Sequence, residues 1–169
     1  MPLLWIENID NVGTIGLWKI DEDEQTLFGL RPVLTEEKEQ LLALKADTKR
    51  RHRLAYRILL QEIIKKNFSL YYDDTGKPFI EGENVHLSVS HSGDYAAVIL
   101  SPTQLVGIDI EKIREHMPSL ASRFLSPTEM GEIDLQNKEL LHIYWGAKEC
   151  LYKMYSDKEP LFSEHLSLQ

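Results

Sequence analysis

The sequence contains one cysteine, Cys150, and no apolar run long enough to cross a membrane. A single thiol excludes an internal disulfide and a cysteine-rich metal site. The N-terminus lacks a basic region followed by an apolar core, so we expect no secretory signal and a cytoplasmic protein. The 169 residues, 43% of them hydrophobic, are enough for one soluble globular domain or two small halves packed together.

The net charge of −8 argues against a general nucleic-acid binder, but the charge is unevenly distributed. Residues 45–66 hold eight basic side chains and two acidic ones, so this segment carries +6 and the rest of the chain −14. A basic patch on an acidic protein can attract a small polyanion or an acidic protein partner. The alternative is the solvated face of an ordinary helix.

Hydrophobic periodicity and turn residues predict the order of helices and strands. We expect strands at 3–6 and 15–20, helices at 35–44 and 48–66, then strands at 79–80, 85–90, 95–100 and 105–110. Short helices at 118–125 and 127–134 precede a long helix at 138–155 and a closing strand at 161–168. This order suggests an α+β fold of two similar halves, residues 1–101 and 102–169, related by a pseudo-twofold axis.

The stretch from Val106 to Lys112 places two carboxylates on one face of an extended chain. Successive side chains of a strand point to opposite sides, so Gly107, Asp109 and Glu111 share a face. Such a pair suits Mg²⁺, which takes one or two carboxylates and completes its coordination with water and phosphate oxygens. The alternative is a strand end with two ordinary surface acids.

On the long helix, Trp145, Glu149 and Lys153 are spaced by four residues and therefore share one face. Glu149 and Lys153 could form no more than a surface ion pair. In a functional interpretation, Glu149 supplies a third carboxylate beside Asp109 and Glu111, and Lys153 holds a phosphate next to the metal. This combination is typical of phosphate chemistry.

The strand from Leu87 to Ser92 ends in the sequence Ser-His-Ser. A Ser/His hydrolase would need the glycines of a nucleophile elbow, and these are missing. The hydroxyl groups and the imidazole could instead bind phosphate oxygens, as could Lys77 in the preceding turn.

Five short motifs occur in order and together resemble the 4'-phosphopantetheinyl transferase superfamily, nearest its surfactin-synthetase-activating type. They are Gly76-Lys77-Pro78, Leu87-Ser-Val-Ser-His-Ser92, Gly107-Ile-Asp-Ile-Glu111, Phe124-Leu-Ser-Pro-Thr-Glu129 and Trp145-Gly-Ala-Lys-Glu-Cys-Leu-Tyr-Lys153. The resemblance covers about residues 45–168. Cys150 stands where these enzymes have a small residue such as alanine or serine.

The resemblance implies transfer of the phosphopantetheine arm of coenzyme A to a serine of an apo carrier protein, with release of adenosine 3',5'-bisphosphate. By position, Asp109, Glu111 and Glu149 would bind Mg²⁺ or Mn²⁺ on the pyrophosphate. Lys153 would stabilise the departing charge, and Glu149 or a water bound to the metal would be the base. Asp109, Glu149 and Lys153 are thus the expected catalytic residues.

The resemblance also implies where the coenzyme lies. Lys77, Ser90 and His91 would hold the adenosine end with its 3'-phosphate, together with an arginine that matches Arg50 by spacing, or else Arg53. The site would occupy the cleft between a coenzyme-binding half, 1–101, and a metal-binding half, 102–169.

With both halves on one chain, we expect a monomer. Its partner would be a fatty-acid, polyketide or peptide-synthetase carrier. The alternatives are a degenerate protein that binds coenzyme A or a carrier without transfer, and a metal-dependent phosphohydrolase.

Overall fold

The protein is described by a computed structural model covering residues 3–31, 35–155 and 160–168. The first part of the chain contains β1 (Leu3–Ile9), β2 (Gly13–Lys19), α1 (Glu24–Leu30), α2 (Thr35–Leu42), α3 (Asp47–Ile64), β3 (Leu70–Tyr72), β4 (Pro78–Ile80), β5 (His86–Ser92) and β6 (Tyr95–Ser101). The second part contains the 3-10 turn η1 (Met117–Leu120), α4 (Ala121–Phe124), α5 (Pro127–Glu132), α6 (Lys138–Met154) and α7 (Phe162–His165). No helix in these described ranges has the length and apolar character needed to span a bilayer.

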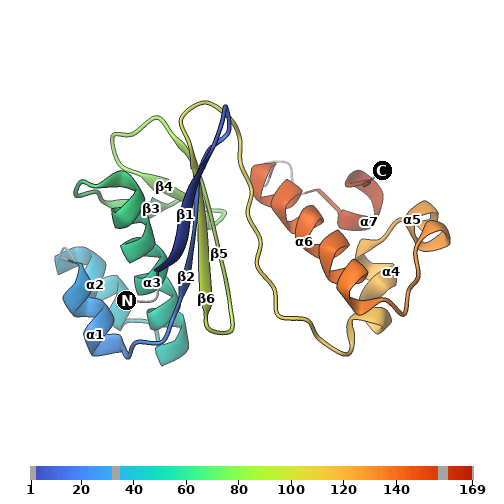
Figure 1. The fold of residues 1–169 in the computed structure, drawn as a ribbon, viewed down its shortest axis with the longest axis horizontal. Helices are drawn as coiled ribbons and strands as arrows, with labels where there is room; N and C mark the ends of the chain where they lie inside the picture. Colours follow the sequence, from blue (N-terminus) through green and yellow to red (C-terminus); the bar gives the residue numbers. More distant parts are fainter. Residues whose placement is uncertain (1–2, 32–34, 156–159, 169) are drawn as a thin grey trace.

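An antiparallel sheet with the strand order β1-β2-β6-β5 forms the centre of the first part, and α3 packs against one face of it (Figure 1). Strands β3 and β4 form a separate two-stranded ribbon. Trp18 from the sheet is buried with Leu54 and Leu59 from α3. The apolar stripe expected on this helix therefore lies against the sheet.

Arg50, Arg53 and Arg57, three of the basic residues in the segment 45–66, are buried or only partly exposed on α3. Arg57 is 1% exposed and forms a buried ion pair with Glu37 of α2. The Arg50 guanidinium pairs with Glu24 of α1 at 2.8 Å and also bonds the carbonyl of Leu44. Two of the three arginines thus bind neighbouring helices, because each meets a carboxylate from a distant part of the chain.

An extended segment, residues 102–116, leaves β6 and runs between the sheet and α6 (Figure 1). Val106 and Ile108 pack against Ala97 and Ile99, on the sheet face opposite α3. The strand expected at 105–110 is extended, but in the described chain it joins no backbone ladder. The described part of the second half is helical, so the mixed α/β character is confirmed, whereas the pseudo-twofold similarity of the halves is not. The division at 101 and 102 stays a prediction.

One further expectation is wrong, and one helix was not expected. The closing strand predicted at 161–168 is wrong, since this region forms the short helix α7. Helix α1 was not predicted, although Asp23 caps it by accepting a hydrogen bond from the Thr26 amide at 2.8 Å. Both helices are short, and tertiary contacts decide their conformation more than local propensity does.

A buried ion pair holds the helices of the second half together. Lys148 of α6 is completely buried, and its ammonium group donates to Glu129 at 2.6 Å, to the Phe124 carbonyl at 2.7 Å and to the Phe162 carbonyl at 3.1 Å. Glu129 in turn accepts from the Leu168 amide at 2.9 Å. The pair therefore connects α6 with the end of α4, with α5 and with the C-terminal segment.

We expect Lys148→Met to lower the free energy of unfolding by about 3–5 kcal/mol, because it leaves the Glu129 carboxylate buried without its cation. Equilibrium urea unfolding measures this change. Lys138→Met is a matched control on the same helix, since Lys138 pairs with the exposed Glu115 and such pairs contribute less than about 1 kcal/mol. The double variant Lys148→Met/Glu129→Met should recover much of the loss. Equal losses for Lys148→Met and the control would contradict this role.

Candidate functional site

Asp109 is the most deeply buried of the predicted site carboxylates. Its side chain is 6% exposed, and its Oδ1 accepts hydrogen bonds from Lys153 Nζ at 2.8 Å and from the Ser90 hydroxyl at 2.9 Å. The second oxygen, Oδ2, is buried and has no hydrogen-bond partner among the described residues. A buried carboxylate oxygen without a partner is costly, so Oδ2 is suited to bind a cation.

Glu111 and Glu149 carry the other two predicted carboxylates. Glu111 accepts from the Ser92 hydroxyl and from the Arg114 guanidinium, both at 3.2 Å. Burial raises the pKa of Glu149, and the charges of Asp109 and Glu111 raise it further, whereas Lys153 has the opposite effect. The three carboxylates therefore lie within electrostatic reach of one another.

In the described residues, however, no three acidic, histidine or cysteine side chains converge as a ready-made metal site. The donor chemistry still fits a hard divalent cation, because Asp109 Oδ2 is unpaired and all the candidate ligands are carboxylate oxygens. Lys153 already lies against Asp109 and donates to the Ile108 carbonyl at 2.8 Å. Lys153 thus offsets part of the negative charge of the three carboxylates.

The carboxylates and Lys153 lie near one another because the extended segment is in close contact with α6. Any side chain at Gly107 would collide with the backbone carbonyl of Cys150, so only glycine lets the segment approach the helix. Burial raises the pKa of the Cys150 thiol and keeps it protonated near neutral pH. The glycine noted in the sequence therefore makes room for a helix beside the carboxylates.

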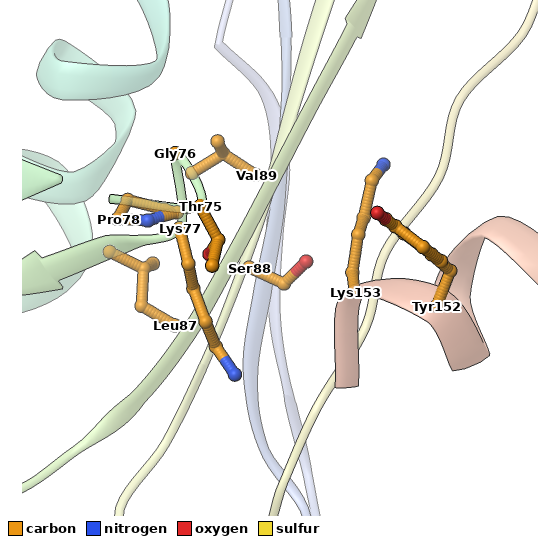
Figure 2. Close-up of a pocket in the computed structure, with 9 residues that line it drawn as sticks. All are labelled: Thr75, Gly76, Lys77, Pro78, Leu87, Ser88, Val89, Tyr152 and Lys153. Atoms are coloured by element: carbon orange, nitrogen blue, oxygen red, sulfur yellow. The ribbon is translucent and has the colours of Figure 1, made fainter. Parts of the chain in front are cut away.

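A cavity of about 150 Å³ lies between the turn after β3 and the end of α6, and Lys153, which bonds Asp109, is one of the residues that line it. Figure 2 shows Lys77 on one side and Tyr152 and Lys153 on the other, with Ser88 of β5 between them. The turn is held by Asp73 Oδ1, which accepts from the amides of Thr75 and Lys77 at 2.9 Å. Two lysines that are far apart in sequence thus line one cavity.

His91 belongs to an aromatic stack on the other face of β5. Its ring lies parallel to that of His52 with 4.3 Å between centroids, and His52 donates to the Gly93 carbonyl at 2.7 Å. Partial burial lowers the pKa of His91, and the neighbouring His52 lowers it further, to about 4. Lys153 and Arg53 also lower this pKa, which places positive charge near the imidazole.

The structure places the remaining predicted residues as follows. Arg53 lies over the Tyr72 ring at 4.9 Å and within electrostatic reach of His91, whereas Arg50 is held by Glu24. The hydroxyl of Ser90 bonds Asp109 and does not line the cavity beside Lys77. Of the two arginines, only Arg53 therefore lies near His91, and which of them binds the coenzyme stays a prediction.

The sequence reasoning did not single out the roles of Ser88, Ser92 and Tyr152. The serines bond the extended segment, and Tyr152 lines the cavity. The alternation Ser-x-Ser-x-Ser on β5 was a usable signal, because it places three hydroxyl groups on one face of a strand. Tyr152 belongs to the motif Trp145–Lys153 but was given no role of its own, because it reaches the cavity through the docking of α6.

Comparison with known proteins gives a consistent result. Residues 105–166 match the family model of the 4'-phosphopantetheinyl transferase superfamily. The chain is 35% identical to the 4'-phosphopantetheinyl transferase AcpT of Salmonella typhi, over 59% of this chain and 56% of that protein. It is 29% identical to the 4'-phosphopantetheinyl transferase Sfp of Bacillus subtilis, over 73% of this chain and 65% of that protein.

A third relative is the L-aminoadipate-semialdehyde dehydrogenase-phosphopantetheinyl transferase of Xenopus laevis, 26% identical over 82% of this chain and 54% of that protein. The chain thus spans between about half and two thirds of the length of these relatives. The matched segment contains Asp109, Glu111, Glu149 and Lys153. Residues 105–166 are thus similar to the 4'-phosphopantetheinyl transferase superfamily, in the segment that holds the predicted site carboxylates.

Proposed function

We propose that this protein transfers the 4'-phosphopantetheine arm of coenzyme A to a serine hydroxyl of an apo carrier protein. The serine oxygen forms a bond to the phosphorus of the phosphopantetheine, and the pyrophosphate P–O bond breaks to release adenosine 3',5'-bisphosphate. The observation that carries the proposal is the buried Asp109 with its unpaired Oδ2, in contact with Lys153 and within a segment of this superfamily.

Asp109, Glu111 and Glu149 would hold Mg²⁺, or Mn²⁺ in its place, which would neutralise charge on the pyrophosphate. Lys153 is suited to bind a phosphate oxygen and to balance the negative charge of the leaving group, since its side chain is 26% exposed beside Asp109. The raised pKa of Glu149 makes this carboxylate a stronger proton acceptor and supports its role as base for the carrier serine.

The coenzyme's adenosine end would lie in the cavity lined by Lys77, with Arg53 and His91 contributing from α3 and β5. Coenzyme A is a polyanion, and the protein has a net charge of −8, so the positive charges of Lys77 and Arg53 are needed to offset repulsion. The finer assignment is the surfactin-synthetase-activating type, supported by the similarity to Sfp. Residues 1–101 would be the coenzyme-binding half and 102–169 the metal-binding half. A cytoplasmic monomer remains our expectation.

The function is tested by intact-protein mass spectrometry of an apo acyl carrier protein incubated with this protein, coenzyme A and Mg²⁺. We expect the carrier to gain one phosphopantetheine, and EDTA to prevent the gain. No gain with fatty-acid, polyketide and peptide carriers, while coenzyme A still binds, would contradict transfer and favour the degenerate binder. Release of adenosine 3',5'-bisphosphate without any carrier would favour a phosphohydrolase.

In the same assay, Asp109→Asn should reduce the transfer rate at least about 100-fold, because it removes a carboxylate that would bind the metal. Without the metal, the repulsion between the pyrophosphate and the other carboxylates would not be offset. Asp10→Asn is the matched control, since Asp10 is exposed at the end of β1. Circular dichroism checks that both variants are folded. Near-normal turnover of Asp109→Asn at saturating Mg²⁺ would exclude Asp109 from the reaction.

The stacked imidazoles predict an unusual pH dependence. NMR titration should find the His91 imidazole neutral down to a pKa of about 4, and His52→Ala should raise that pKa. An unfolded chain takes up this proton near pH 6.5, so the contribution of His91 to stability is present above pH 6.5 and is lost as the pH falls towards 4. Comparison with His91→Asn, which lacks this imidazole, identifies the NMR signal of His91. An unchanged His91 pKa in His52→Ala would refute the electrostatic coupling.

A further inference from the structure

Three serines on one face of β5 form a regular set of hydrogen bonds with the extended segment. The hydroxyls of Ser88, Ser90 and Ser92 accept from alternate backbone amides of this segment. The bonds run from Ile108 at 3.1 Å, from Ile110 at 3.2 Å and from Lys112 at 3.2 Å, in that order. We call these three residues the serine ladder.

Two members of the serine ladder also contact the site carboxylates. Ser90 donates its hydroxyl proton to Asp109 Oδ1 at 2.9 Å, and Ser92 donates to Glu111 Oε2 at 3.2 Å. A hydroxyl group has one proton and two lone pairs, so it can accept from an amide and donate to a carboxylate at once. In both cases the carboxylate belongs to the residue just before the amide that is bound.

The serine ladder takes the place of an ordinary backbone ladder. Residues 105–112 pair with no strand in the described chain, so the hydroxyl bonds specify their register relative to β5. A shift by one residue would turn Asp109 and Glu111 away from α6 and turn Ile108 and Ile110 towards it. Register and carboxylate orientation are therefore fixed by the same hydroxyl groups.

We propose that Ser90 and Ser92 are positioning residues that orient Asp109 and Glu111 for a divalent cation. Ser90 and Lys153 both bind Oδ1 of Asp109, which directs the unpaired Oδ2 towards Gly146 on α6. This inference rests on the proposed function, because the cation is that of the transfer reaction. It gives Ser90 a different role from the coenzyme contact expected from the sequence.

Ser88 supplies a matched control within the same structure. It accepts from the Ile108 amide as the other two accept from theirs, but its hydroxyl contacts no carboxylate in the described residues. Ser88 also lines the cavity beside Lys77, so the Mn²⁺ affinity of each variant is compared at a coenzyme A concentration that saturates that variant. Under this condition, removal of the Ser88 hydroxyl group reports the effect of losing one backbone bond. The difference between Ser88→Ala and the other two alanine variants isolates the contact with the carboxylates.

The experiment measures Mn²⁺ affinity by electron paramagnetic resonance in the presence of saturating coenzyme A. We expect Ser90→Ala and Ser92→Ala to weaken Mn²⁺ binding by about 10- to 100-fold, the range for groups that orient metal ligands. Ser88→Ala should retain the wild-type Mn²⁺ affinity. Ser92→Thr should restore binding, because it keeps the hydroxyl group. Coenzyme A affinity in EDTA should be unchanged in Ser92→Ala.

Ser90 is buried, so Ser90→Ala could unfold, and the half-buried Ser92 then decides the question. Wild-type Mn²⁺ affinity in a folded Ser92→Ala protein overturns the proposal. So does an equal loss of affinity in Ser88→Ala, which would assign the effect to register alone. If the wild-type protein binds Mn²⁺, loses affinity in Ser92→Ala, and yet transfers nothing, only the proposed function is overturned. A wild-type protein that binds no Mn²⁺ overturns the serine ladder's role.

Discussion

Residues 105–112 are held between β5 and α6 by two kinds of contact, one made by serine hydroxyls and one that only a glycine allows. On one side, serine hydroxyls bind alternate backbone amides of the segment. On the other, Gly107 lies so close to the Cys150 carbonyl that a methyl group would not fit. Asp109 therefore meets Lys153 of α6 and Ser90 of β5 at the same oxygen.

The position of α6 depends in turn on the buried Lys148, which neighbours Glu149 in the sequence. Lys148 satisfies its ammonium group with two backbone carbonyls and the Glu129 carboxylate, away from the cavity. Lys153 can then contact the extended segment. The motif Trp145–Lys153 thus combines a buried lysine, Lys148, that fixes the helix with a half-buried lysine, Lys153, that contacts Asp109.

Most of the fold could be predicted from the sequence, because α3, α6, β5 and β6 have clear hydrophobic periods. Helix α7 could not, since its backbone is bound by Lys148, and a fully buried lysine is too rare to expect from a sequence. The likeness of the two halves was inferred from the predicted order of helices and strands, and the described part of the second half, which is helical, does not confirm it.

The candidate site could be predicted from the sequence about as far as the fold could. Alternation along the extended segment placed Asp109 and Glu111 on one face, and helical spacing placed Glu149 near Lys153. The choice between Arg50 and Arg53 could not be made by spacing alone. It depends on Glu24, a residue 26 positions away that binds Arg50 in the folded chain. Contacts of this kind follow from tertiary packing and have no local signature.

A crystal structure of the protein with coenzyme A and Mn²⁺ tests the central claim most directly. The account predicts an anomalous-scattering peak at Asp109 Oδ2, the pyrophosphate against Lys153, and the adenosine end in the cavity beside Lys77. A coenzyme bound in that cavity with Mn²⁺ elsewhere would contradict the assignment of the carboxylates. A coenzyme bound away from both lysines would contradict the account as a whole.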